Sequence, residues 1–120
     1  MTRRGDAART FKEKLAAGHD VTLNAISYFE FKRELVLPRF SRTLTEFQAF
    51  VAGNCLLPLN EPSLDQAVMV YQNLRATGRL LEDADILVAG IALAHDAVLV
   101  TRNLKHFRRV GGLRLESWEA

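Results

Sequence analysis

The chain has 120 residues, of which 48% are hydrophobic and 25% are charged, with a formal net charge of +2 and a pI near 9.0. This length supports one domain with a single modest core, and the composition is that of a globular protein, which excludes intrinsic disorder. The slight positive charge permits a polyanionic partner without requiring one.

The cysteine content and the length of the apolar runs favour a cytoplasmic protein. The lone Cys55 excludes an intrachain disulfide and a zinc site built only from cysteines, so a reducing compartment fits best. No stretch approaches the roughly 20 apolar residues that a membrane span needs, and the polar beginning differs from a signal peptide. We therefore expect a cytoplasmic protein without a membrane segment.

Helical and strand patterns alternate along the chain. Phe11 and Leu15, four residues apart, indicate an amphipathic helix that Gly18 ends. Ser27, followed three residues later by Glu30, has the spacing of a capping box and predicts a helix start. In chain order the expected elements are helix 7–17, strand 21–23, helix 27–36, a helix from 41 or 43 to 53, strand 55–59, helix 62–76, helix 83–95, strand 97–101, helix 104–108 and strand 113–115.

This alternation predicts an α/β fold in which helices flank a parallel sheet, because parallel strands need crossover connections of helix length. The chain has no internal repeat or linker, so we expect one domain spanning residues 1–120. The beginning of the chain is unusual for this class. A doubly wound sheet normally opens with a hydrophobic strand, whereas "MTRRGDAART" is polar and is typical of the connection after a strand.

Two carboxylates, Asp83 and Asp85, directly precede the hydrophobic run "ILVAG". One interpretation is helix capping, with Asp83 as the N-cap and Asp85 in the first turn, where the helix dipole favours negative charge. The other is a metal site, since neighbouring carboxylates repel one another unless a cation such as Mg²⁺ neutralises them. Asp85 is the stronger ligand candidate, because the buried helix face that follows would fix its direction.

Glu30 and Asn103 also have both a structural and a functional interpretation. Glu30 either completes the capping box with Ser27 or contributes to a site at the edge of the parallel sheet, where open α/β folds bind ligands. Asn103 either caps the short helix that follows it or orients a metal-bound water, as the Thr101 hydroxyl could. If Glu30 and Asp85 lie at the same sheet edge, they can converge.

A cluster of basic residues follows the predicted carboxylate site. Cations beside such a site suit a polyphosphate substrate, with the carboxylates holding a metal and the cations holding the backbone. The alternative is a solvated surface helix. Zinc-ligand spacing, a Gly-rich phosphate loop and a nucleophile elbow are absent from the sequence. The basic cluster consists of Arg102, Lys105, His106, Arg108 and Arg109.

Three segments of the sequence together resemble the PIN domain of VapC-type toxins. They are "NAISYFEFKREL", "LEDADILVAGIALAHDAVLVTRNLKHF" and "GLRLESW", and the resemblance extends from about Arg4 onward. The run from Asp83 to Phe107 is its most specific part. The resemblance implies a Mg²⁺- or Mn²⁺-dependent endoribonuclease toxin of a type II pair. It also implies a homodimer and inhibition by a cognate antitoxin whose tail enters the active site.

The resemblance assigns roles to individual residues. Glu30 matches the acid in the helix after the second strand, and Asp85 matches the acid that opens the helix before the fourth strand. Asp83 is a frequent acidic companion, and Asn103 falls where many members carry a last aspartate. The implied catalytic residues are Glu30, Asp85 and Asn103, the implied metal ligands are Glu30, Asp85 and Asp83, and the expected RNA contacts are Arg102, Lys105, His106 and Arg108.

The sequence departs from the family at its beginning. The family opens with a central hydrophobic strand ending in an L-D-T-N-like motif, whose aspartate is a metal ligand, and this chain has neither. Asp6 is no substitute because no strand precedes it. We expect a gap in the sheet with unpaired backbone groups on both sides.

Three hypotheses follow from the sequence. The first is a metal-dependent ribonuclease whose natural start lies further upstream. The second is a catalytically impaired remnant that binds an antitoxin or dimerises without cutting RNA. The third is an unrelated α/β domain whose acids only cap helices.

Overall fold

Short strands that pair in parallel alternate with helices in the computed structural model, which describes residues 23–52, 56–101 and 103–117. The chain divides into two units, Met1–Leu57 and Pro58–Ala120, and each is described by itself. The predicted helix 7–17, Cys55 and Arg102 lie outside the described residues. The expectation of a single domain stays a prediction.

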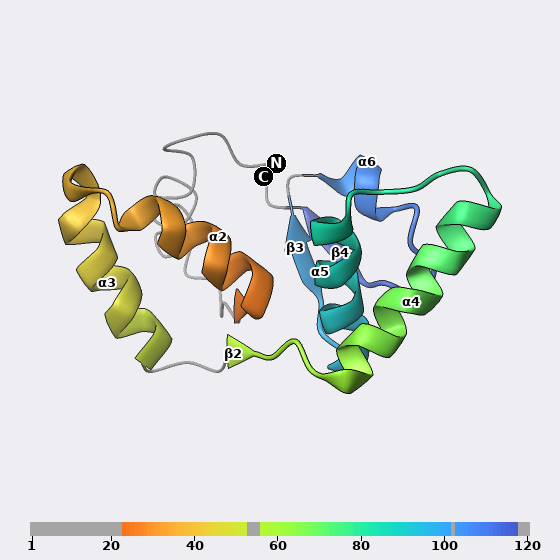
Figure 1. Cartoon of the computed structure of the whole chain (residues 1–120), viewed down its shortest axis with the longest axis horizontal. Coiled ribbons are helices and arrows are strands. Elements are labelled where there is room, and N and C mark those ends of the chain that lie inside the picture. Colours follow the sequence, from red (N-terminus) through yellow and green to blue (C-terminus); the bar gives the residue numbers. More distant parts are fainter. Residues whose placement is uncertain (1–22, 53–55, 102, 118–120) are drawn as a thin grey trace. The chain divides into compact units, whose positions relative to one another are not determined.

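In the described part of the first unit, a pair of short strands accompanies the helices α2 and α3 (Figure 1). The two strands pair in parallel, with Leu23 opposite Leu56 and Asn24 opposite Leu57. This pairing confirms the predicted parallel arrangement on this side of the fold. In chain order the elements are β1 (Leu23–Asn24), α2 (Ala25–Leu35), the 3₁₀ turn η1 (Pro38–Phe40), α3 (Ser41–Ala52) and β2 (Leu56–Leu57).

The N-cap of α2 is Asn24, whose side-chain oxygen accepts a hydrogen bond from the Ser27 backbone N–H at 2.8 Å. The predicted capping box of Ser27 and Glu30 is therefore wrong. The helix begins directly after β1, so Asn24 takes the cap position and Ser27 becomes the third helical residue. Glu30 consequently lies one and a half turns into the helix rather than in its first turn.

An aromatic cluster joins α2 to α3. Phe47 is fully buried, and its ring centroid lies 5.7 Å from that of Tyr28 and 6.1 Å from that of Phe31. Leu23 and Leu35 complete the buried set. This packing fixes the face of α2 that points inward and so the direction of the residues on its other faces.

The second unit contains a helix pair and a second pair of parallel strands (Figure 1). Leu99 lies opposite Leu115 and Thr101 opposite Ser117. The last strand begins two residues later than predicted because its register follows that of its partner. The elements are α4 (Glu61–Ala76), α5 (Asp83–Ala94), β3 (Leu99–Thr101), α6 (Leu104–Phe107) and β4 (Leu115–Ser117).

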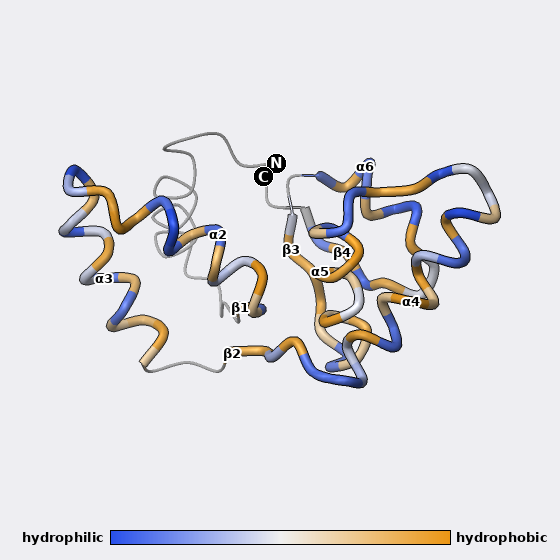
Figure 2. The backbone as a smooth tube through the Cα atoms, viewed as in Figure 1, coloured by the Kyte–Doolittle hydropathy of each residue, from blue (hydrophilic) through white to orange (hydrophobic). Residues whose placement is uncertain are grey.

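Small residues allow α4 and α5 to pack closely. Gly90 lies against the chain of α4, where an added Cβ would be 2.6 Å from the Ser63 carbonyl oxygen and 2.8 Å from the Ala67 Cβ. Figure 2 shows the hydrophobic run through α5 and β3, which agrees with the burial of Ile86 and Ile91. The helix pair therefore forms the core of this unit, and it fixes the direction in which the beginning of α5 points.

The described strands form two separate parallel pairs, β1 with β2 and β3 with β4. Among the described residues, no helix combines the length and the apolar character needed to cross a membrane.

Candidate functional site

The carboxylates of the candidate site lie at the beginning of α5. Glu82 takes the N-cap position without a side-chain capping hydrogen bond, and Asp83 and Asp85 occupy the first turn. The prediction that Asp83 is the N-cap is therefore wrong by one residue. Both aspartates lie where the free N–H groups and the dipole of the helix favour negative charge. Asp83 is exposed, whereas Asp85 is half-buried.

The environment of Asp85 is unfavourable to an unpaired negative charge. Burial raises the pKa of the Asp85 carboxyl above its ordinary value of 3.8, and the neighbouring Glu82 carboxylate raises this pKa further. His106 acts in the opposite direction and lowers this pKa. A nearby cation therefore stabilises the charged form of this half-buried carboxylate more than it would stabilise a fully solvated carboxylate.

The segment after β3 combines buried apolar residues with exposed basic ones. Phe107 and Val110 are buried and anchor α6, while Lys105, His106 and Arg108 are exposed. The effect of His106 on the Asp85 pKa connects the two elements, which lie at the same end of the unit in Figure 1. Among the described members of the basic cluster, His106 has an electrostatic effect on Asp85. The predicted grouping of the other basic residues with the carboxylates stays a prediction.

Asn103 and Thr101 occupy the connection between β3 and α6. The Thr101 hydroxyl accepts a hydrogen bond from the Asn103 backbone N–H at 2.9 Å. Asn103 is the N-cap residue of α6, but its side chain makes no capping hydrogen bond and is exposed. The capping interpretation of the Asn103 amide is therefore not supported, and the prediction that it orients a water molecule stays a prediction.

Glu30 belongs to the other unit, where it is half-buried on α2. Because the two units are described separately, its predicted convergence with Asp85 stays a prediction. Within the described ranges, no three histidine, cysteine, aspartate or glutamate side chains gather closely enough to hold a metal ion.

Two basic residues near the site were not among the predicted RNA contacts. Arg109 donates a hydrogen bond from its guanidinium to the Leu80 carbonyl oxygen at 3.1 Å, across 29 residues of sequence. Arg79 is exposed in the same connection between α4 and α5. The only local signal for Arg79 is its place after Gly78, which ends a helix. Nothing in the sequence indicates that this connection reaches the turn after α6.

Two curated proteins are similar to the chain in sequence, while no protein-family model matches it. The tRNA(fMet)-specific endonuclease VapC of Shigella flexneri is 31% identical over 77 residues, which cover 64% of this chain and 58% of that protein. Ribonuclease VapC2 of Rickettsia felis is 41% identical over 46 residues, covering 38% of this chain and 34% of that protein. The matched segment thus spans less than two thirds of either relative's length.

Several solved structures have the same fold over most of both chains. VapBC2 from Rickettsia felis bound to a promoter DNA fragment has a TM-score of 0.77 at 18% identity, covering 93% of this chain and 96% of that chain. DNA-bound VapBC from Salmonella typhimurium has a TM-score of 0.75 at 22% identity, covering 91% and 84%. VapBC-1 from nontypeable Haemophilus influenzae has a TM-score of 0.74 at 21% identity, covering 93% and 87%. At these identities the similarity shows the fold alone.

Proposed function

We propose that this chain, a PIN domain of the VapC type, is an endoribonuclease toxin that cleaves RNA phosphodiesters with a divalent metal ion. The observation that carries the proposal is the half-buried Asp85 carboxylate at the start of α5, on whose pKa His106 acts. The exposed basic residues of α6 lie at the same end of the unit (Figure 1). Carboxylates for a metal and cations for phosphates are the two components that metal-assisted phosphodiester hydrolysis requires. The sequence similarity to proteins named as VapC ribonucleases supports the same activity.

The carboxylates at the start of α5 suit Mg²⁺ or Mn²⁺ chemically. Mg²⁺ takes about one or two protein carboxylates and fills its remaining positions with water and substrate phosphates. A set of three protein ligands within one unit is therefore not required. A bound cation would also favour the charged form of Asp85, which burial and Glu82 disfavour in its absence.

The proposed roles divide between the two units. Asp85, with Asp83 beside it, and Glu30 hold the metal, which when bound activates water and neutralises charge on the scissile phosphate. Asn103 presents its exposed amide to orient the attacking water. Lys105, His106 and Arg108, together with Arg102, bind phosphates of the RNA on either side of the scissile bond.

We further propose an antitoxin protein as the partner of this chain and a homodimer as its assembly. The structures with the same fold were determined as VapBC complexes, which supports an antitoxin for this chain as well. Such a partner would regulate the nuclease by covering the cationic and acidic groups at the start of α5. The homodimer rests on the family resemblance.

An RNA-cleavage assay with one conservative variant tests the proposed activity. In Mg²⁺ or Mn²⁺ the chain should cleave a labelled RNA, and EDTA should stop the reaction. Asp85→Asn should lower the rate at least about 100-fold, because even partners of metal ligands cost about 10- to 100-fold when mutated. Asp65→Asn is the control, since Asp65 is an exposed aspartate of α4 and has no proposed role in the site.

The same assay separates the proposal from the non-cutting alternative. A folded chain that leaves RNA intact with both metals, and yet binds an antitoxin or dimerises, would contradict the ribonuclease and leave the remnant hypothesis. Equal cleavage by the wild type and Asp85→Asn would place the active site elsewhere.

A further inference from the structure

We propose that Arg79 binds a phosphate of the RNA strand, which extends the cationic surface of α6 onto the connection between α4 and α5. The inference rests on the proposed ribonuclease function and adds a substrate contact from a segment that the sequence pattern did not indicate. It is carried by the turn that ends α4 and by the hydrogen bond that joins this connection to Arg109.

The backbone at Arg79 is held in a fixed turn. Gly78 has a φ of +67°, which residues with a Cβ rarely adopt. The Gly78 N–H donates to the Arg75 carbonyl at 3.1 Å, and the Arg79 N–H donates to the Leu74 carbonyl at 2.8 Å. This is the Schellman pattern, which ends α4 and reverses the chain toward α5. The Cα of Arg79 is thus fixed while its side chain stays exposed.

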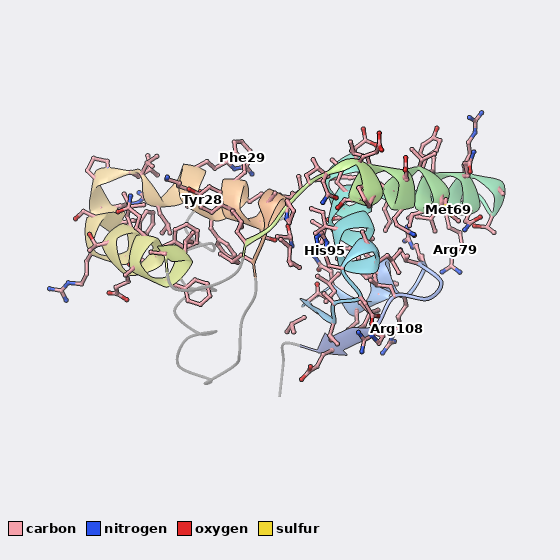
Figure 3. The ribbon with its side chains drawn as sticks, turned by 90° about the horizontal axis from the view of Figure 1, so that it is seen from below. Tyr28, Phe29, Met69, Arg79, His95 and Arg108 are labelled. Carbon is pink, nitrogen blue, oxygen red and sulfur yellow. The ribbon has the colours of Figure 1, made fainter. Side chains whose placement is uncertain are left out.

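A second contact holds this connection beside α6. Arg109 follows the buried Phe107 and donates to the Leu80 carbonyl at 3.1 Å. Leu80, the residue after Arg79, is therefore hydrogen-bonded to the turn that follows the basic residues of α6. Figure 3 shows Arg79 and Arg108 on the same side of α4. Arg79 and the cations of α6 thus come from two segments far apart in the sequence that a tertiary hydrogen bond joins.

The charges of these residues are not balanced by ion pairs in the described part of the chain. The ion pair found there joins Arg114 to Asp96 at 3.0 Å, at the other end of α5. The nearest acid in sequence to Arg79 is Glu82, the N-cap of α5, and no ion pair joins these two described residues. Like charges gathered in this way disfavour the free protein and favour a bound polyanion.

A nucleic-acid backbone fits this arrangement better than a single anion does. Guanidinium groups pair with phosphate oxygens in a bidentate manner, and a strand presents a phosphate at every nucleotide. A strand whose scissile phosphate lies at Asp85 carries further phosphates, which would follow the cations of α6 onto the adjoining α4–α5 connection. An acidic peptide is the competing partner, and measuring the dependence of each affinity on Arg79 distinguishes the peptide from RNA.

The test measures RNA binding as a function of salt. Fluorescence anisotropy of a fluorescein-labelled, mixed-sequence single-stranded RNA, in EDTA to prevent cleavage, gives log Kd against log salt concentration. Each phosphate contact contributes about 0.7 to this slope for single strands. Arg79→Gln should therefore lower the slope by about 0.7, and Arg79→Lys should retain most of it. Arg114→Gln is the matched control, because its cation is already paired with Asp96, and it should leave the slope unchanged.

Three results would overturn the inference. The first is a folded Arg79→Gln variant with the wild-type slope, and the second is a wild-type chain that does not bind the RNA. The third is an Arg79-dependent affinity for a polyglutamate peptide without such dependence for RNA, which would assign the residue to a protein partner. RNA cleavage in Mg²⁺ by the same preparation is a separate measurement, so the ribonuclease can stand while the role of Arg79 fails.

Discussion

Replacement of Gly90 by alanine tests the packing that positions Asp85. The added Cβ would lie 2.6 Å from the Ser63 carbonyl oxygen, 2.8 Å from the Ala67 Cβ and 2.9 Å from the Ala67 nitrogen. Two of these three atoms belong to the backbone of α4, so no side chain can rotate away to relieve the contact. The two helices must instead separate by most of an ångström.

The expected loss of stability follows from two opposing terms. Overpacking a well-packed core costs about 1–3 kcal/mol, and the upper part of this range applies where backbone must move. Alanine in place of glycine in a helix interior recovers about 1 kcal/mol. We therefore expect the free energy of unfolding to fall by about 1–2 kcal/mol, which corresponds to a Tm lower by about 4 °C or more.

Thermal or urea denaturation followed by circular dichroism measures this difference. Gly111→Ala is the control, since its Cβ would meet no atom within 4 Å, and it should change stability by less than about 0.5 kcal/mol. A Gly90→Ala variant as stable as the wild type, or more stable, would refute the close packing of α4 against α5. The fixed direction of the first turn of α5 would then lose its physical basis.

Two further predictions concern a helix cap and the charge of Asp85. Asn60→Ala should lower the free energy of unfolding by about 1–2 kcal/mol, because the Asn60 oxygen accepts hydrogen bonds from the Ser63 N–H at 3.1 Å and the Ser63 hydroxyl at 2.8 Å. Asn60→Asp should retain most of the stability in the same denaturation assay. Equal losses of stability in the alanine and aspartate variants would contradict the cap. The raised pKa of Asp85 means that its charged form destabilises the folded state. Asp85→Asn in EDTA should therefore raise the Tm at neutral pH. This gain in Tm should shrink as the pH falls toward the ordinary aspartate pKa of 3.8. A lower Tm for this variant at neutral pH would show that the Asp85 charge is stabilising.

Most of the element types could be predicted from the sequence, because each has a local cause. The helices expected over residues 62–76 and 83–95 are present as α4 and α5. Alternation with short strands predicts parallel pairing, which both strand pairs confirm. The capping residues were harder to predict from the sequence. At both α2 and α5 several neighbouring polar residues can cap a helix, and the end of the preceding segment decides which one does. Asn24 and Glu82 therefore take positions that the pattern alone assigns to Ser27 and Asp83.

The candidate site could be predicted only where neighbours in sequence are also neighbours in space. The first turn of α5 follows from its own residues, and the half-burial of Asp85 follows from the buried face after it. Arg79 could not be found in this way, because the hydrogen bond from Arg109 to the Leu80 carbonyl depends on tertiary packing across 29 residues. The convergence of Glu30 with Asp85 is likewise a long-range property, and it requires a direct test.

Calorimetric titration of the chain with Mn²⁺, alongside Glu30→Gln, Asp85→Asn and the double variant, tests that convergence most directly. One shared metal site predicts that the wild type binds Mn²⁺, that each single variant loses most of the affinity, and that the double variant loses little more than either single one. Circular dichroism of each variant confirms that it is folded. A folded wild-type chain that binds no Mn²⁺, or two single variants whose losses simply add, would contradict a common metal site for Glu30 and Asp85.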